Sequence, residues 1–198
     1  VLIKASAGGG GRGMRIVRPG DDLAEAFKRC QAEAGAAFGN DAVYVERFIE
    51  RARHIEVQVL GDGGDAPVHL WERECSLHRR NQKLVEVAPS PTLTEDTRQQ
   101  LLDTALRLAA RVGYRSLGTF EFLVDADESH FAFIEANPRL QVEHTVTEEI
   151  TGVDLVQAQL KVAGGASLAD LGLTRPPQPL GFAMQLRVNM ETMEASGE

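Results

Sequence analysis

The sequence predicts an α+β fold, in which antiparallel strands come in runs and a few helices interrupt them. The main observation is a succession of three strand-like stretches with alternating apolar residues, at residues 43–49, 54–60 and 68–77. A second pair of such stretches, 117–124 and 130–137, surrounds a short polar loop. Strands grouped in this way indicate α+β rather than the regular strand–helix alternation of a parallel sheet.

The N-terminal part of the chain predicts two short strands and one helix. Val1–Ile3 is a short apolar strand, and Met14–Val17 is typical of a returning strand. Asp21 or Asp22 is suited to cap the helix that follows. That helix is expected to end near Gly39, because apolar residues keep near-helical spacing up to that point, at Leu23, Phe27, Cys30, Ala34 and Phe38.

The remaining elements follow from turn and cap signals. The three stretches between residues 42 and 77 predict an antiparallel meander, with a glycine-rich turn at 61–65. Thr94 is suited to cap a helix with an apolar stripe, and Gly113 is suited to end it. The last predicted elements are a hairpin over 117–137, a helix over 153–163, a proline-rich loop over 173–180 and a strand over 181–189.

Composition and charge narrow the class of protein. The 198 residues are 43% hydrophobic, enough for a folded core, and carry a net charge of -8. So acidic a chain lacks the positive field that attracts nucleic acid or anionic lipid, and it has no run near the roughly 20 apolar residues of a membrane span, so neither partner is expected. Two cysteines, Cys30 and Cys75, are too few for a disulfide framework and favour a cytoplasmic compartment.

The glycine run Gly8–Gly13 is a candidate phosphate-binding segment. It matches a dinucleotide fingerprint formally, but that fingerprint requires a helix immediately afterwards, whereas Met14–Val17 is strand-like. A glycine hairpin remains, in which exposed backbone N–H groups can approach phosphate oxygens, with Lys4 and Arg12 adding positive charge. The alternative is a mobile hairpin without a ligand.

Two glutamates on the predicted hairpin are candidate metal ligands. If Val124 pairs with His130, Glu121 lies opposite Phe133 and shares a face with Glu135. Diagonal neighbours of this kind have Cα atoms about 7–8 Å apart, near enough to share a hard cation such as Mg²⁺. The alternative is a pair of solvated glutamates on an exposed sheet face.

A row of polar residues follows the second glutamate. Pro138 favours extended geometry at Asn137, and in an extended segment alternate residues share one face. The polar face then carries Glu135, Asn137, Arg139, Gln141 and Glu143. Two acids, two amides and an arginine in one row suit metal-assisted chemistry on an anion, although a wet amphipathic edge strand explains the same alternation.

Five motifs together resemble the biotin carboxylase component of biotin-dependent carboxylases, which has the ATP-grasp fold. They are Lys4-Ala5-Ser6 with the glycine run, Glu72-Arg73-Glu74-Cys75-Ser76, Arg79-Arg80-Asn81-Gln82-Lys83, Gly118-Thr119-Phe120-Glu121-Phe122, and the stretch from Glu135 to His144. The similarity covers essentially the whole chain. It departs from the common family pattern at His78 and Asn81, and around Arg187, which leaves the finer nucleotide and biotin contacts open.

The resemblance implies an ATP and metal site. Lys4 would contact the ATP phosphates, and the hairpin Gly8, Gly9, Gly10, Gly11 and Gly13 would be the tip of a lid that closes over them. The segment from Glu46 to Ile49 would hold the adenine, with His54 and Leu123 also near the nucleotide. The implied ligands of Mg²⁺, or Mn²⁺, are Glu121, Glu135 and Asn137.

The resemblance also implies the chemistry. Glu143 would be the general base that deprotonates bicarbonate, while the anion is held by Lys83, Arg139, Gln141 and Val142. Bicarbonate would attack the γ-phosphate to form carboxyphosphate, whose CO₂ passes to biotin, with Arg187 stabilising the biotin enolate. Such an enzyme works with a biotin carboxyl carrier domain and a carboxyltransferase, and an acyl-CoA is the acceptor that the resemblance favours.

The chain is expected to be a piece of a longer protein, truncated at both ends and inactive alone. It opens at Val1 without Met and closes on a loop-like segment, 194–198. The expected division is a lid subdomain, 1–48, and an incomplete C-terminal subdomain, 49–198, which carries the metal and bicarbonate site. The full-length form is expected to be a homo-oligomer in the cytoplasm, or in the mitochondrial matrix if eukaryotic.

Two other functions remain as alternatives. One is another ATP-grasp ligase that uses carboxyphosphate, such as half of a carbamoyl phosphate synthetase. The other is a non-catalytic ATP-binding module. The second is disfavoured because a scaffold needs none of the charged residues that the sequence retains together, namely Lys4, Lys83, Glu121, Glu135, Arg139, Glu143 and Arg187.

Overall fold

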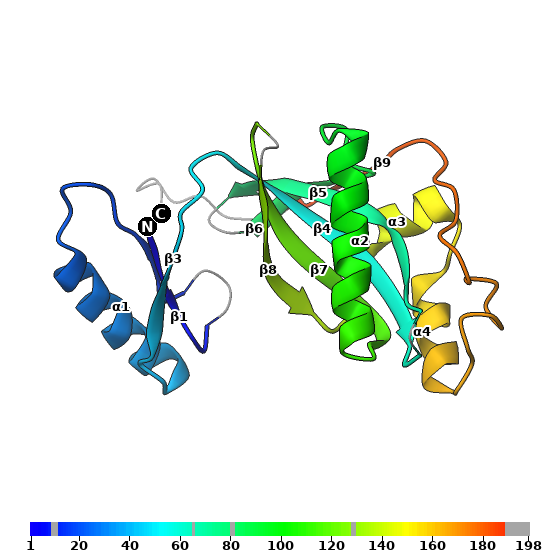
Figure 1. Ribbon diagram of the computed structural model, residues 1–198, viewed down its shortest axis with the longest axis horizontal. Coiled ribbons are helices and arrows are strands. Elements are labelled where there is room, and N and C mark those ends of the chain that lie inside the picture. Colours follow the sequence, from blue (N-terminus) through cyan, green and yellow to red (C-terminus); the bar gives the residue numbers. More distant parts are fainter. Residues whose placement is uncertain (9–11, 65, 80–81, 128–129, 189–198) are drawn as a thin grey trace. The chain divides into compact units, whose positions relative to one another are not determined.

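The computed structural model describes residues 1–8, 12–64, 66–79, 82–127 and 130–188. The chain forms two compact units, Val1–Glu50 and Arg51–Glu198 (Figure 1). Each unit has its own sheet, so each is described by itself. Within the described ranges, no helix has the length and apolar character needed to cross a membrane.

The first unit is a three-stranded antiparallel sheet with one helix. Strand β1, Leu2–Ala5, lies between β2, Met14–Ile16, and β3, Val43–Glu46. Helix α1, Leu23–Phe38, packs against this sheet (Figure 1). The side chain of Asp22 accepts a hydrogen bond from the Glu25 backbone N–H at 3.0 Å, and Gly39 closes the helix in the left-handed conformation. The predicted helix and its caps are confirmed.

One glycine of the run has a structural role in the core of this unit. Gly13 has φ +67°, and a Cβ there would lie 2.9 Å from the Cβ of Ala5. Its carbonyl oxygen accepts hydrogen bonds from the Ala5 backbone N–H at 2.8 Å and from the Cys30 thiol at 2.9 Å. Only glycine fits this conformation and this close approach without strain.

The predicted meander over residues 42–77 is wrong at its first strand. Strand β3 pairs with β1, with Ile3 opposite Val45 and Ala5 opposite Val43. It therefore belongs to the first unit, where Val43 packs against the core of Ile3, Val17 and Cys30. Strand periodicity cannot reveal this choice of partner, because both sheets offer an edge to the same alternating pattern.

The second unit is a six-stranded antiparallel sheet in the order β8-β7-β4-β5-β6-β9. The strands are β4, Ala52–Asp62; β5, Val68–Arg79; β6, Gln82–Ala88; β7, Arg115–Asp125; β8, Phe131–Asn137; and β9, Ala183–Leu186. Strand β6 was not predicted, because the basic residues before Lys83 resemble a solvated surface segment. It lies between β5 and β9 and is required to place Lys83.

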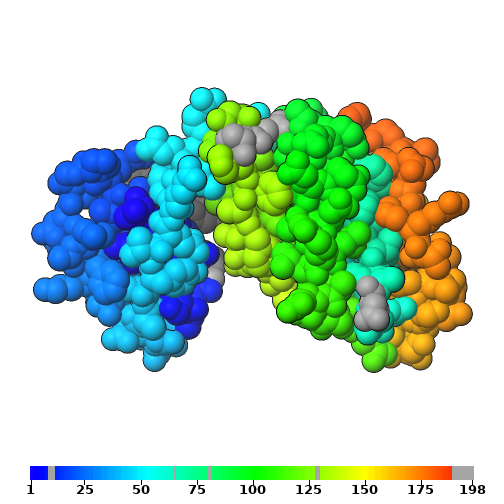
Figure 2. Space-filling model, viewed as in Figure 1, coloured from blue at the N-terminus to red at the C-terminus, as the bar shows by residue number. Residues whose placement is uncertain are grey.

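Helices cover both faces of this sheet (Figure 1). Helix α2, Glu95–Arg111, lies over one face, and the view in Figure 2 shows it as the green surface in front of the strands. Its predicted cap is confirmed, since the Thr94 side chain accepts from the Thr97 backbone N–H. Helices α3, His144–Thr151, and α4, Leu155–Ala163, lie on the opposite face. The predicted helix over 153–163 thus corresponds to α4, whereas α3 was not predicted.

The two faces bury different side chains. The α2 face is an apolar core of Ile55, Val57, Val59, Phe120, Phe122 and Val124 against Leu101, Leu102, Ala105 and Ala109. On the opposite face, α4 covers a smaller apolar patch that includes Leu60, Leu70 and Leu117. The remainder of that face is polar. It carries the residues discussed below.

A β-bulge decides which residues of β5 reach the polar face. The β4–β5 pairing shifts between Val57 and Val59, opposite Trp71, which has φ 69°. A bulge inserts one extra residue into a strand, so the alternation of side chains between the two faces is shifted by one residue beyond it. Leu70 lies on the α4 face before the bulge, and Arg73 lies on that same face after it. The strained Trp71 is fixed by its ring N–H, which donates to the Pro177 carbonyl oxygen at 2.7 Å.

Candidate active site

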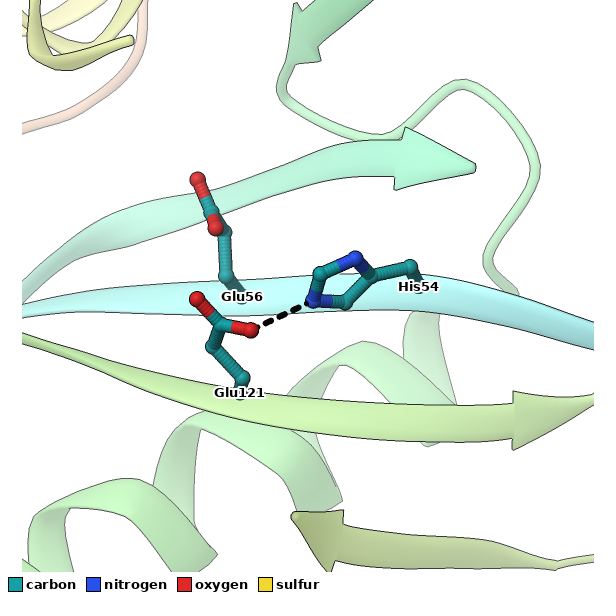
Figure 3. Close-up of side chains that lie close together, drawn as sticks. All are labelled: His54, Glu56 and Glu121. Atoms are coloured by element: carbon teal, nitrogen blue, oxygen red, sulfur yellow. Dashed lines mark hydrogen bonds and ion pairs between the residues drawn. The ribbon is translucent and has the colours of Figure 1, made fainter. Parts of the chain in front are cut away.

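A cluster of buried polar side chains occupies the centre of the polar face. Alternate residues of a strand point to one side, so β4 contributes His54, Glu56 and Gln58 while β7 contributes Thr119 and Glu121. Glu56 and Glu121 are directly paired in the β4–β7 ladder. Figure 3 shows His54, Glu56 and Glu121 projecting to the same side of neighbouring strands.

Arg73 is the centre of a hydrogen-bond network that the sequence analysis missed. The side chains of Arg73 and Glu56 are fully buried, and Arg73 Nε donates to Glu56 Oε1 at 2.6 Å. Arg73 Nη1 donates to Gln58 Oε1 at 2.8 Å and to Thr147 Oγ1 at 2.9 Å. Burial favours the neutral form of Arg73, but the carboxylate of Glu56 outweighs it and raises the pKa of Arg73. The polar alternation of His54, Glu56 and Gln58 was the signal in the sequence.

Lys83 is the second cation of the cluster. Its Nζ lies 2.5 Å from Glu56 Oε2, 2.6 Å from Glu143 Oε1 and 3.6 Å from Glu121 Oε1. Burial alone would lower the pKa of Lys83, but these carboxylates raise it above its ordinary value. Lys83 is therefore a permanent positive charge where three acids converge.

Glu143 lies between two cations at the start of helix α3. It is 3% exposed, and Arg187 Nη2 donates to its Oε2 at 2.7 Å while Lys83 holds the other oxygen. The carboxylate therefore has one cation on each oxygen. The sequence analysis selected Lys83, Glu143 and Arg187 separately, and the structure places them in direct contact.

The predicted extended row is wrong beyond Asn137. Strand β8 ends there, because proline has no N–H with which Pro138 could continue the ladder, and the chain turns into α3. The turn directs Gln141 and Glu143 inward, where both are buried. It leaves Arg139 exposed, with its guanidinium donating to the Leu140 carbonyl oxygen at 3.2 Å. Within the described contacts Arg139 does not reach the cluster.

The predicted carboxylate pair is present in a different register. Glu121 lies directly opposite Glu135 rather than opposite Phe133, because Val124 pairs with Phe131 and a bulge follows between Glu121 and Phe122. The predicted diagonal arrangement is therefore wrong. The side chain of Asn137 joins the pair, since its Nδ2 lies 2.9 Å from Glu121 Oε1 and 3.2 Å from Glu135 Oε1.

Glu121 is held in its ionised form. Burial would raise the pKa of Glu121, but the hydrogen bond from His54 at 2.8 Å and the charge of Lys83 lower it to about 2. Gln141 Nε2 also donates to it, at 3.1 Å. Two glutamates and an asparagine offer hard oxygen ligands, which fit Mg²⁺. The ring of His54 stacks on that of His78, with centroids 5.4 Å apart.

A second set of potential metal ligands in the cluster already surrounds a cation, the ammonium of Lys83. Ligand atoms of Glu56, Cys75 and Glu143 lie within 4.8 Å of one another. The Lys83 ammonium contacts both carboxylates, so it takes the place that a metal ion would need. Burial raises the pKa of Cys75 and keeps it a thiol.

The remaining predicted residues are distributed over both units. Lys4 Nζ lies 3.9 Å from Glu46 Oε1 in the first unit. Ile49 follows β3 and is half-buried. In the second unit Leu123 pairs with His54 in the ladder, and the side chain of Val142 is 62% exposed. Part of the glycine run, Gly9, Gly10 and Gly11, and the family departure at Asn81 lie outside the described residues.

Comparison with known proteins identifies the family of this chain. The family model described as the carbamoyl-phosphate synthase L chain, ATP binding domain, matches residues 1–171. A curated pyruvate carboxylase from Aspergillus terreus is 55% identical over 192 residues, which are 96% of this chain and 16% of that protein. The chain thus spans less than a fifth of the length of this relative.

Solved structures agree with the family match. A biotin carboxylase from Campylobacter jejuni superposes with a TM-score of 0.89 at 44% identity, covering 98% of this chain and 43% of that one. The biotin carboxylase domain of a 2-oxoglutarate carboxylase from Hydrogenobacter thermophilus, solved with MgADP, ADP and bicarbonate, gives a TM-score of 0.84 at 45% identity, covering 94% and 40%. The predicted α+β, ATP-grasp fold is confirmed. The chain belongs to the family of the carbamoyl-phosphate synthase L chain ATP-binding domain, as an ATP-grasp ligase domain of the biotin carboxylase type.

Proposed function

We propose that the chain carries the ATP- and bicarbonate-dependent carboxylation of protein-bound biotin through carboxyphosphate, the first half-reaction of a biotin-dependent carboxylase. The observation that carries the proposal is the buried carboxylate of Glu143, held by Lys83 on one oxygen and by Arg187 on the other. Bicarbonate is an anion with a proton to lose, so activating it requires cations that bind the anion and a carboxylate that accepts the proton.

The roles within this group follow from charge and position. Lys83 supplies positive charge for bicarbonate, Glu143 accepts its proton, and Arg187 stabilises the biotin enolate. Gln141 is fixed between Glu121 and Arg73 and presents an amide to the same region. Arg139 and the backbone at Val142 complete the proposed anion site. Their exposure leaves them available to a ligand rather than committed to the cluster.

The side chains of Glu121, Glu135 and Asn137 would hold Mg²⁺ or Mn²⁺. When bound there, the metal neutralises charge on the phosphoryl group that is transferred. His54 and Gln141 hold Glu121 in place and Lys83 keeps it ionised, so the ligands are prepared in advance. The Asn137 amide must turn its oxygen toward the ion, because only the oxygen of an amide is a metal ligand.

Each unit carries residues to which the resemblance assigns a contact with ATP. In the first, Lys4 would contact the phosphates, the segment from Glu46 to Ile49 would hold adenine, and the hairpin Gly8–Gly13 would close over the phosphates as a lid. The exposed N–H groups of a glycine hairpin suit phosphate oxygens. In the second, His54 and Leu123 share the face that carries Glu121 and would lie near the nucleotide.

The whole enzyme is proposed to be a pyruvate carboxylase. The curated relative at 55% identity bears that name, which favours pyruvate over the acyl-CoA acceptor that the sequence suggested. Because the chain covers 16% of that relative, the carboxyl carrier and carboxyltransferase domains would lie in other parts of the protein or in other subunits. Homo-oligomerisation is part of the proposal. So is a reducing location, the cytoplasm or mitochondrial matrix, which the free thiols Cys30 and Cys75 support.

The decisive variant is Glu143→Gln in the full-length protein. Removing the base should leave ATP binding largely intact while reducing bicarbonate-dependent ATP cleavage by about 10²–10⁴-fold. Glu149→Gln, an exposed glutamate on the same helix, is the matched control and should behave as wild type. Unchanged ATP cleavage in Glu143→Gln would refute the assignment. No ATP cleavage in the wild type under any condition would indicate a non-catalytic ATP-binding module instead.

The same assay separates the two ligase classes. A biotin carboxylase needs biotin for rapid ATP cleavage, whereas a carbamoyl phosphate synthetase-like ligase needs a nitrogen donor. Stimulation by ammonia in place of biotin would favour the second class, whose name the matching family model bears.

A further inference from the structure

Glu86 of β6 is a buried acid to which neither the motifs nor the proposed function gives a role. It is 0% exposed, and its Oε1 lies 2.6 Å from Arg187 Nη2. Among the described residues, neither carboxyl oxygen of Glu86 has a hydrogen-bond partner of good geometry, and neither does Nε of Arg187. A buried carboxylate that is paired by charge but poorly hydrogen-bonded is costly, so its presence calls for an explanation.

Arg187 is shared between Glu86 and the proposed base. The same Nη2 atom that lies 2.6 Å from Glu86 lies 2.7 Å from Glu143 Oε2. Lys83 holds Glu143 Oε1 at 2.6 Å. Both oxygens of Glu143 are therefore engaged by cations in this arrangement. Two cations in contact stabilise the ionised carboxylate and oppose its protonation, so withdrawal of one of them would make Glu143 a stronger base.

Arg187 is better placed to withdraw than Lys83. Lys83 also contacts Glu56 and Glu121, so moving it would remove positive charge from two further buried carboxylates. Arg187 has 27% of its side chain exposed and has one other acid beside it, Glu86. A small movement toward Glu86 would release Glu143 Oε2 and keep the guanidinium paired.

We propose that Glu86 is a positioning residue that takes over Arg187 when Glu143 accepts the bicarbonate proton. In that step the O–H bond of bicarbonate breaks and the proton moves to Glu143 Oε2. The electron pair left on the bicarbonate oxygen then forms the bond to the γ-phosphorus of ATP, and ADP leaves with the electrons of the broken P–O bond. Glu143 becomes neutral, and Glu86 supplies the negative charge that Arg187 then needs.

The electrostatics of the pair agree with this order of events. Burial raises the pKa of Glu86, the charge of Arg187 lowers it, and the charge of Glu143 raises it further. Protonation of Glu143 removes that repulsion, so the ion pair between Glu86 and Arg187 strengthens at the moment when it is required. The inference rests on the proposed role of Glu143 as the base.

The test compares Glu86→Gln with Glu86→Asp in the full-length protein, by steady-state ATP cleavage at varied bicarbonate and varied ATP. The amide cannot balance Arg187, so Glu86→Gln should lower kcat between about tenfold and a hundredfold, which is the scale for a displaced catalytic group. The KM for ATP should not change. Glu86→Asp keeps the charge and should recover most of the lost kcat, which a purely structural role of Glu86 would not produce.

The matched control is Glu72→Gln. Glu72 is also fully buried and also paired with an arginine, Arg98 Nε at 2.9 Å, but it lies on the α2 face. The Glu72→Gln variant should lower the midpoint of thermal unfolding as much as Glu86→Gln does, without changing kcat. The proposal is overturned if Glu86→Gln has the wild-type kcat, or if the Gln and Asp variants of Glu86 are equally impaired.

Failure of this inference can be told apart from failure of the proposed function. If Glu143→Gln abolishes ATP cleavage while Glu86→Gln is normal, only the role of Glu86 is wrong. If Glu143→Gln is itself fully active, the base assignment fails and the inference fails with it.

Discussion

The two faces of the six-stranded sheet are built from the same strands but have opposite character. In β4, Ile55 and Val57 enter the apolar core under α2, while Glu56 and Gln58 enter the polar cluster on the other face. In β7, Phe122 and Glu121 divide in the same way. Because successive side chains of a strand point to opposite faces, one strand can bury apolar side chains on one face and hold charged side chains on the other. Substitutions on the polar face should therefore change both stability and activity, whereas substitutions in the apolar core should change stability alone and by a smaller amount.

The largest effect is expected on the polar face, for Arg73→Leu. Removing the guanidinium leaves Glu56 buried with Lys83 alone, which should lower the free energy of unfolding by about 4 kcal/mol and also reduce bicarbonate-dependent ATP cleavage. Urea denaturation and steady-state kinetics measure the two effects. The double variant Arg73→Leu, Glu56→Gln should regain part of the stability. A double variant no more stable than the single one would show that the pair is not coupled.

A smaller effect confined to stability is expected on the α2 face, for Leu101→Ala. Leu101 is fully buried against the sheet, and the cavity left by its side chain should cost about 3 kcal/mol of unfolding free energy. The kcat of the folded enzyme should be unchanged, because the apolar core does not contact the charged cluster. A loss of kcat comparable to that of Arg73→Leu would break the contrast between the two faces.

A pH effect is expected from His69, which also lies near α2. Burial lowers the pKa of His69 to about 4, against an ordinary value of 6.5. Below pH 6.5 the unfolded chain binds a proton that the folded chain does not, so stability is complete above this pH and is lost as the pH falls toward 4. Relative to His69→Gln, the wild type should lose about 2 kcal/mol between about pH 6.5 and pH 5. Parallel stability curves for the two proteins would contradict the expectation.

The smallest effect is expected at the start of α2, for Thr94→Ala. The Thr94 side chain accepts a hydrogen bond from the Thr97 backbone N–H, and loss of such a cap costs about 1 kcal/mol. Thr94→Ser keeps the hydroxyl and serves as the control. Equal melting temperatures for Thr94→Ala and Thr94→Ser would show that the cap contributes nothing.

Local signals in the sequence were sufficient for helices α1, α2 and α4 and for the family. Asp22 and Thr94 cap helices where predicted, since a cap depends on residues within one turn of it. Helix α3 was not predicted, because its N-cap, Glu143, makes no side-chain capping hydrogen bond and the alternating polar and apolar residues before it resembled a strand. The register of the β7–β8 hairpin was also missed. A bulge beside Glu121 has no clear signature in a single sequence.

The sequence by itself determined which chemical groups are present: the glycine run, the acids Glu121, Glu135 and Glu143, and the cations Lys83 and Arg187, each recognisable from neighbouring residues. Only the tertiary structure decided which acid meets which cation. Glu143 meets Lys83 across 60 residues and Arg187 across 44, and the bulge at Trp71 turns Arg73 toward Glu56. Such pairings depend on strand order, register and bulges, which result from the packing of the whole sheet and are not encoded in any one segment.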